Sequence, residues 1–383
     1  MIYLNNAATT LQKPPCVAEA VLVALSGAGS CSRGASDDDL AAARSVAGAR
    51  VKAARLLGCA HPRRVCFTSN ATQALNTAIF GVLSPGDHVI ATDFEHNSVL
   101  RPLHALEARG DIEVDYLPAD AAGRLHMGDL EGLFRPNTRA VVATHASNLT
   151  GAVTDAAAFA GASHAHGALF ILDASQTAGA VPIDMGALGA DIVCFTGHKA
   201  LMGPQGTGGL AVVDGVDVAP LLHGGTGVKS AEPDQPASYP EHLEAGTMNA
   251  HGLAGLDAAL GFLLDIGVER VAAHEARLRA RFMEGALSVP GVTVYGARDG
   301  HAHTGVVALN IDGIDSSRLA DTLARDYGVA TRAGLHCAPR MHEALGTIGS
   351  GAVRFSFGWY TTDSDIDAAI GALERIAAGT GGR

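Results

Sequence analysis

The stretch Asp191-Ile192-Val193-Cys194-Phe195-Thr196-Gly197-His198-Lys199 decides the fold that we predict for this chain. It begins as a short apolar run of the kind that forms a buried strand, and polar residues follow directly. The glycine-rich segment 203–209 comes next and allows the backbone to pack closely around Lys199. A lone lysine is usually a solvated surface charge, which needs no such packing. We therefore interpret Lys199 as a functional residue after the carboxyl end of a strand.

The same alternation of apolar runs and helical stretches extends over residues 64–213. It is typical of an α/β fold, in which helices cover both faces of a mainly parallel sheet, here of seven strands. The expected strands are Val65–Thr68, His88–Thr92, Ile112–Leu117, Ala140–Thr144, Leu169–Asp173, Asp191–Phe195 and Gly209–Val213, and the helices between them include Thr72–Val82, Val99–Arg109 and Thr154–His166.

The flanking sequence predicts a second, smaller α+β domain. Residues 214–250 are rich in Gly, Pro and Ser and indicate irregular structure, whereas 252–287 reads as one long helical region. We expect a large domain over residues 13–250 and a small domain over 251–383, joined by the N-terminal arm 1–12. The remaining expected elements are helices at Pro14–Leu25, Asp37–Leu57 (with Ser36 as its N-cap), Ser316–Tyr327 and Asp365–Ala378, and strands near Val292–Tyr295 and Val306–Asn310.

The composition excludes several classes of protein. A chain of 383 residues favours two domains, and 48% hydrophobic with 17% charged residues is typical of a soluble enzyme. The net charge of −12, without clustered Lys and Arg, argues against nucleic-acid binding. No apolar stretch approaches the roughly 18 residues of a membrane span. The first residues lack a secretory signal, and six scattered cysteines without a CxxC pair indicate free thiols, so we expect a cytoplasmic protein.

Polar residues at the expected strand ends supply the groups that pyridoxal phosphate (PLP) chemistry needs. Ligands of open α/β sheets lie beyond the carboxyl ends of the strands. Lys199 follows one strand and Asp173 ends another, whereas Ala71-Thr72 opens a helix after a third. A lysine amine holds the PLP aldehyde, a carboxylate pairs with the pyridine nitrogen, and a helix N-terminus binds the phosphate. Taken singly, each residue has an ordinary structural interpretation, so their combination carries the prediction.

The sequence resembles the PLP fold-type I enzymes of aminotransferase class V, and within them the cysteine desulfurases and selenocysteine lyases. The resemblance runs nearly from end to end, although Asn5 stands where many relatives have aspartate. The matching segments are Tyr3–Thr10, Asn70–Asn76, Glu95–Ser98, Asp173–Gln176, Thr196–Lys199, Glu244–Thr247, Arg332–Pro339 and Val353–Ser356.

This resemblance implies how the cofactor ring is held. Lys199 resembles the lysine that binds the PLP aldehyde, and Asp173 resembles the partner of the pyridine nitrogen. His96 resembles the imidazole that stacks on the ring. Gln176 resembles the donor to the phenolic oxygen, with Asn148 on the same side.

It also implies a phosphate site and a substrate clamp. The phosphate ligands would be Ala71 (through its backbone), Thr72, Thr196 and His198. Thr247 resembles a threonine that reaches the phosphate of a neighbouring subunit, which implies a homodimer. Arg354 resembles the clamp on the substrate carboxylate, where a bidentate guanidinium suits a planar anion, and Asn148 and Arg332 support it.

Cys337 decides between reactions. It follows His336, has arginine at 332 and 340, and precedes a short helix expected to begin at Pro339. Cationic neighbours and a helix N-terminus both favour the thiolate, which is the nucleophilic form of cysteine. The residues alone leave a structural cysteine equally open, and the resemblance favours a catalytic one. We therefore expect a cysteine desulfurase that produces alanine and a persulfide on Cys337.

Three alternatives remain at this point. The first is another reaction on the same fold, such as selenocysteine lysis, β-elimination or epimerisation. The second is a sulfur-handling protein that delivers persulfide to an acceptor protein and turns over little alone. The third is a binding module without catalysis, which would not need Lys199, Asp173 and Arg354 together. No metal site is expected, because the histidine pairs lack a third ligand at a suitable spacing.

Overall fold

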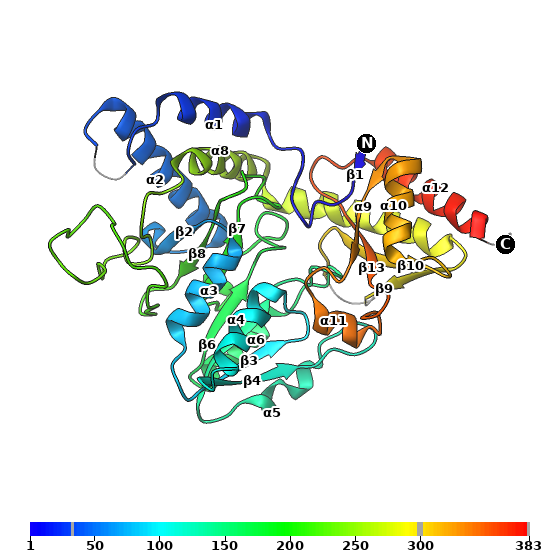
Figure 1. Ribbon diagram of the computed structural model, residues 1–383, viewed down its shortest axis with the longest axis horizontal. Helices are drawn as coiled ribbons and strands as arrows, with labels where there is room; N and C mark the ends of the chain where they lie inside the picture. The colour runs from blue at the N-terminus through cyan, green and yellow to red at the C-terminus, as the bar shows by residue number, and fades with distance from the viewer. Residues whose placement is uncertain (32–33, 297–301, 381–383) are drawn as a thin grey trace.

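A computed structural model describes residues 1–31, 34–296 and 302–380 of the chain. The larger part is built on a seven-stranded sheet with the order β2-β8-β7-β6-β5-β3-β4 (Figure 1). All neighbouring strands are parallel except β8, which is antiparallel to both β2 and β7. This confirms the predicted α/β class and the mainly parallel sheet. The strands are β2 (Val65–Thr68), β3 (Asp87–Thr92), β4 (Ile112–Leu117), β5 (Thr138–Thr144), β6 (Leu169–Asp173), β7 (Ile192–Thr196) and β8 (Gly208–Val212).

Helices cover both faces of this sheet because its strands are apolar on both sides. In β7, Ile192 and Cys194 join one buried cluster, whereas Val193 and Phe195 join the other. Helices α3 (Ala71–Val82) and α4 (Asn97–Glu107) cover the first face. Helices α2 (Asp37–Leu57), α6 (Ala156–Ala165) and α8 (Ala250–Ile266) cover the second. Three further helices are α1 (Pro15–Gly27), α5 (Leu130–Leu133) and α7 (Met185–Leu188).

The long helical region expected over 252–287 is present, but it forms two helices, because the chain bends by 79° between α8 and α9 (Val268–Ser288). Gly267 lies at the bend with φ +84°, a conformation that a residue with a side chain rarely adopts. Helix α8 packs on α1 and α2 in the large domain (Figure 1). The division after residue 250 stays a prediction, and this packing supports placing it at Gly267 instead. No single described helix is long and apolar enough to cross a membrane; only the bent α8–α9 pair passes by length and composition.

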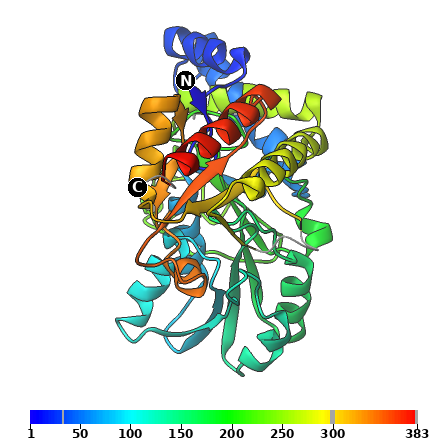
Figure 2. The same ribbon diagram turned by 90° about the vertical axis from the view of Figure 1, so that its right-hand side faces the viewer.

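The smaller part packs helices on a four-stranded antiparallel sheet with the order β12-β13-β10-β9. Its strands are β9 (Val292–Tyr295), β10 (Val306–Ile311), β12 (Arg332–Gly334) and β13 (Ala352–Ser356), and its helices are α9, α10 (Ser316–Tyr327), α11 (Pro339–Ala344) and α12 (Asp363–Thr380). The N-terminal strand β1 (Ile2–Tyr3) pairs in parallel with β11 (Val329–Ala330). In Figure 2 these later elements, coloured yellow to red, lie in front of and above the green and blue large sheet. The first strand and the last described helix therefore both lie on the smaller part.

The glycine-rich segment that leads into β8 packs backbone against backbone at Gly208, the first residue of the strand, as the sequence predicts. A Cβ atom on Gly208 would lie 2.7 Å from the backbone of Asn70 and 2.8 Å from the carbonyl oxygen of Phe195. Asn70 caps α3, since its side chain accepts a hydrogen bond from the Gln73 N–H group. The lack of a side chain at Gly208 therefore allows the backbone of β8 to pack against the backbone at the start of α3.

Gly208→Ala is expected to destabilise the fold by about 1–3 kcal/mol, because the new methyl group must displace backbone atoms. Gly161→Ala is the matched control. Gly161 lies inside α6, and a Cβ atom added there would meet nothing within 4 Å, so alanine should raise stability by about 0.5–1 kcal/mol. Differential scanning calorimetry of both variants checks this expectation. Equal melting temperatures for the two variants would contradict the close packing at Gly208.

Candidate active site

A cavity of about 210 Å³ lies where the carboxyl ends of β5, β6 and β7 face the smaller sheet. Thr144, Asp173 and Thr196 end these three strands and line the cavity. All but two of the predicted site residues are brought together here. Those that line it are Ala71, Thr72, His96, Asn148, Asp173, Gln176, Thr196, His198, Lys199, Arg332 and Arg354. Cys337 and Thr247 lie outside its lining.

Lys199 follows β7 and is held through its backbone. Its carbonyl oxygen accepts hydrogen bonds from the Thr10 hydroxyl (2.7 Å) and from the Met202 N–H group (2.9 Å). Burial lowers the pKa of its amine to about 8, against the opposing effect of the Asp173 charge. A substantial fraction of Lys199 is therefore the neutral, nucleophilic amine near physiological pH.

Asp173 is 2% exposed at the end of β6. Its Oδ1 accepts a hydrogen bond from the Ser175 N–H group at 2.9 Å, and the Ser175 hydroxyl contacts the same oxygen. These contacts fix the orientation of the carboxyl group. Asp173 can therefore accept a hydrogen bond from a cationic group in the cavity. Ser175 was not predicted, although it lies inside the matching segment Asp173–Gln176.

One end of the cavity holds donors suited to a phosphate. The Thr196 Oγ1 and His198 Nδ1 atoms are buried, yet neither has a hydrogen-bond partner among the described residues. Helix α3 begins beside them at Ala71 and Thr72, whose N–H groups have no intrahelical acceptor. Buried polar atoms without partners are rare and costly. An anionic ligand at this end would satisfy them.

His96 caps α4 and is held as a neutral imidazole. Its Nδ1 accepts hydrogen bonds from the Ser98 N–H group (3.0 Å) and pairs with the Ser98 hydroxyl (2.9 Å). Burial, followed by the charge of Lys199, lowers the pKa of His96 to about 4. Since Nδ1 accepts from a backbone donor, Nε2 carries the proton. Ser98 also contacts the Thr72 hydroxyl at 2.8 Å and is a second residue that the sequence analysis missed.

The opposite wall comes from the smaller sheet. Arg354 in β13 is 1% exposed and donates from Nη1 to the Asn148 carbonyl (2.8 Å) and from Nη2 to the Asn5 Oδ1 (3.3 Å). Its Nε and the Asn148 Oδ1 are buried without a partner in the described part of the chain. Burial, followed by the charge of Arg332, lowers the pKa of Arg354. Neither arginine is paired with a carboxylate in the described chain, so both can bind an anionic substrate group.

Cys337 lies in the turn between β12 and α11. The Cys337 carbonyl oxygen accepts a hydrogen bond at 2.8 Å from the N–H group of Asn97, the residue that follows His96. Asn148, which lines the cavity, donates to the carbonyl oxygen of the preceding His336 at 2.6 Å, so the turn lies against the cavity. His336 and Cys337 have φ values of +51° and +58°. Left-handed conformations at residues other than glycine cost about 1–3 kcal/mol each and often mark functional sites.

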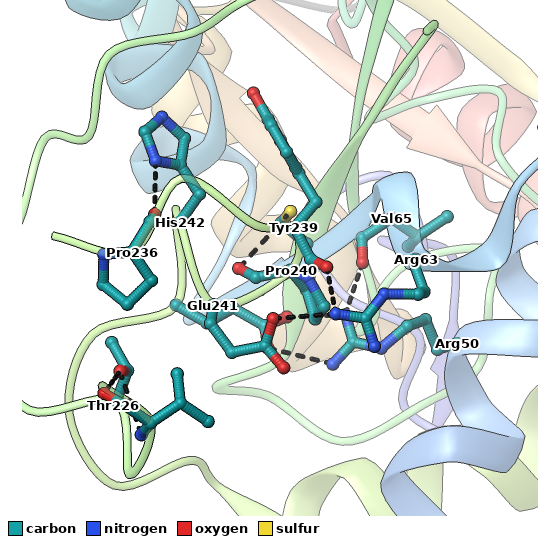
Figure 3. Close-up of polar contacts among 12 residues, drawn as sticks. Arg50, Arg63, Val65, Thr226, Pro236, Tyr239, Pro240, Glu241 and His242 are labelled. Atoms are coloured by element: carbon teal, nitrogen blue, oxygen red, sulfur yellow. Dashed lines mark hydrogen bonds and ion pairs between the residues drawn. The ribbon is translucent and has the colours of Figure 1, made fainter. Parts of the chain in front are cut away.

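Thr247 is exposed on a separate cavity that Glu244 and Met248 also line. The segment leading to it is irregular, as predicted, but is tied to the large domain (Figure 3). Arg63 contacts the Tyr239 carbonyl and donates to Glu241 Oε2 at 2.9 Å. Glu244 forms a buried ion pair with Arg50 at 2.7 Å. The outward position of Thr247 fits a role toward another subunit, which stays a prediction.

The six cysteines are free thiols, and among the described residues no cluster of His, Cys, Asp or Glu side chains could hold a metal ion.

A sequence profile described as "Aminotransferase class-V" matches residues 2–369. The chain belongs to the class-V aminotransferase family. This family assignment confirms the resemblance that the sequence segments indicated, and it agrees with the architecture of the cavity.

Relatives of this class-V chain match it over nearly its whole length. A probable cysteine desulfurase of Methanothermobacter thermautotrophicus is 33% identical, over 98% of this chain and 94% of its own. A probable cysteine desulfurase of Pseudomonas putida is 34% identical, over 97% of this chain and 93% of its own length. The structure of an apo cysteine desulfurase from Thermococcus onnurineus NA1 superposes with a TM-score of 0.93 and 30% identity, over 99% of this chain and 95% of that one.

The lowered pKa of Lys199 predicts its reactivity. Only the uncharged amine attacks an arylating reagent, so the rate of modification should rise with pH and reach half its maximum near pH 8, against 10.5 for an ordinary lysine. Trinitrobenzenesulfonate labelling of the cofactor-free chain over a pH series, read by peptide mass spectrometry, measures this. The exposed Lys229 is the comparison within the same digest. Coincident pH profiles for Lys199 and Lys229 would contradict the expectation.

Proposed function

We propose that this class-V enzyme is a PLP-dependent cysteine desulfurase, which converts L-cysteine to L-alanine and leaves the sulfur on Cys337 as a persulfide. The observation that carries the proposal is that the Cys337 turn is hydrogen-bonded to Asn148 and Asn97, beside a cavity lined by Lys199, Asp173 and Arg354. The names of the relatives support the same activity.

The cavity fits PLP at three points. Lys199 would hold the aldehyde carbon, and Asp173 would pair with the pyridine nitrogen. Thr196, His198 and the start of α3 would bind the phosphate, which gives partners to the two buried atoms that lack them. When bound, PLP supplies a conjugated ring that accepts the electron pair left at the substrate α-carbon. His96 and Gln176 would contact the ring and its oxygen, as the family resemblance implies.

The substrate carboxylate is proposed to bind Arg354. The guanidinium Nε and the Asn148 Oδ1 are both without hydrogen-bond partners in the described chain. The substrate carboxylate could accept a hydrogen bond from Nε, and the substrate amino group could donate one to Oδ1. Arg332 adds a second positive charge to the same wall. Asn5 contacts Arg354 without neutralising it, whereas an aspartate at this position would compete with the substrate for the guanidinium. With asparagine at position 5, the positive charge of Arg354 therefore stays available to bind the substrate carboxylate.

The chemical work is divided between Lys199 and Cys337. Lys199, whose pKa lies near 8, removes the α-proton and can later return a proton to the substrate. The Cys337 thiolate then attacks the substrate sulfur, so that a new S–S bond forms and the substrate Cβ–S bond breaks. The electron pair of the broken bond stays on Cβ, which takes up a proton and becomes the methyl group of alanine.

The proposal includes two partners. A second copy of the chain would place its Thr247 at the phosphate end of this cavity, where Asn70 and Thr72 are exposed. A sulfur-acceptor protein would remove the persulfide sulfur from Cys337, whose turn is partly exposed. The predicted cytoplasmic location fits both partners.

Cys337→Ala is expected to lower alanine formation from cysteine by about two orders of magnitude or more, because the sulfur acceptor is lost. Exchange of the substrate α-proton with D₂O should continue, since Lys199 performs it. Cys16→Ala, in the partly buried α1, is the matched control. Amino-acid analysis gives alanine and NMR gives the exchange rate. Unchanged alanine formation in Cys337→Ala would refute the role of this thiol.

Arg354→Lys is expected to raise KM for cysteine about tenfold, with a smaller change in kcat, because an ammonium cannot bind a carboxylate in the bidentate manner. Arg318→Lys, at an exposed position of α10, is the control. Steady-state kinetics measures both constants. An unchanged KM in Arg354→Lys would remove Arg354 from the substrate site.

A further inference from the structure

The turn that carries Cys337 has a backbone conformation that its own residues do not favour. The Ala338 N–H group donates to the Leu335 carbonyl at 2.9 Å, which closes a four-residue turn. Its two central residues, His336 and Cys337, both have positive φ. Turns with this pattern are dominated by glycine, asparagine and aspartate. Contacts outside the turn must therefore hold it in this conformation.

The large domain supplies two of these contacts through the turn backbone. The Asn148 Nδ2 donates to the His336 carbonyl at 2.6 Å, and the Asn97 N–H group donates to the Cys337 carbonyl at 2.8 Å. Both donors lie next to or within the cavity lining. They fix where the turn approaches the cavity, but they do not contact the side chain of His336.

That side chain is the first member of a buried row of three polar groups. His336, His342 and Thr347 are 2%, 0% and 3% exposed. The His336 Nδ1 lies 3.5 Å from the His342 Nε2, and the two rings are within 10° of parallel. The 5.7 Å between ring centres nearly equals this gap plus the two ring radii, so the rings meet edge to edge, as a hydrogen bond requires.

Burial lowers the pKa of His336 to about 3 and that of His342 to about 4, so both imidazoles are neutral. Only one arrangement of protons then satisfies this row of polar groups. The His336 Nε2 lies 3.0 Å from the Arg332 carbonyl, which can only accept, so Nε2 carries the proton. His336 Nδ1 then accepts from His342 Nε2–H. The bare His342 Nδ1 must in turn accept from the Thr347 hydroxyl, 2.7 Å away.

We infer that Thr347, His342 and His336 form a directional chain of hydrogen bonds that positions Cys337 for sulfur transfer. This series of hydrogen bonds begins at the Thr347 hydroxyl and ends on the carbonyl of Arg332. It therefore ties the turn to β12, the strand that carries Arg332, which we propose binds the substrate. The inference rests on the proposed function, because the position of Cys337 matters to catalysis only if its thiol accepts sulfur. His336, His342 and Thr347 are positioning residues, since none of them lines the cavity.

The decisive variant is Thr347→Val, which removes the hydroxyl and keeps the size of the buried side chain. The matched control is Thr347→Ser, which keeps the hydroxyl. Three measurements are made on the PLP-loaded enzyme: alanine formation from cysteine, exchange of the cysteine α-proton with D₂O, and amide hydrogen exchange of the peptide that covers Leu335–Met341. The last is repeated on the cofactor-free chain, where no activity is involved.

In Thr347→Val we expect alanine formation to fall about tenfold and the amides of the turn to exchange about tenfold faster, whereas α-proton exchange stays unchanged. Thr347→Ser should behave like the parent enzyme. The inference is overturned if Thr347→Val keeps the parent rates, or if it slows α-proton exchange as much as alanine formation, since the effect would then be general. If the parent enzyme forms no alanine while Thr347→Val still loosens the turn, the proposed function fails and the hydrogen-bond chain stands.

Discussion

Parallel strands that neighbour one another end at the same edge of a sheet, and the rest of this molecule depends on that constraint. Thr144, Asp173 and Thr196 are brought side by side because β5, β6 and β7 run in one direction and pair in register. Lys199 follows a few residues after the last of these strands. Residues far apart in the sequence thereby gain fixed relative positions, and burial at this edge lowers the pKa of Lys199.

The cavity is organised by polar atoms that the described chain itself leaves without partners. Thr196 Oγ1 and His198 Nδ1 lie at one end, and Arg354 Nε and Asn148 Oδ1 lie at the other. Each such atom costs free energy in the isolated chain, which a ligand would recover by supplying an anion to the three donors and a donor group to the Asn148 oxygen. The two ends therefore differ in what they can bind. Hydroxyl, imidazole and helix amides suit a phosphate, whereas a guanidinium suits a carboxylate.

The sequence was sufficient to predict those parts of the structure that depend on local pattern. Lys199 and Asp173 were found because each follows an apolar run, and the sheet was found because its strands are apolar on both faces. The bend at Gly267 was missed because glycine inside a helical pattern does not distinguish a continuous helix from a break. His342 and Thr347 were missed because burial decides their role, and the sequence does not show which histidines are buried.

The first ten residues connect the two parts of the molecule. Ile2 pairs with Val329, the Ala7 N–H group donates to the Ser356 hydroxyl at 2.9 Å, and the Thr10 hydroxyl reaches the Lys199 carbonyl. The arm is synthesised before the large sheet, whereas its partners in β11 and β13 are synthesised after it. Although the large sheet can assemble while synthesis continues, the arm can take its place only after Ser356 has emerged. The cavity is therefore completed only after β13 has been made, by a segment that was synthesised before the whole large sheet.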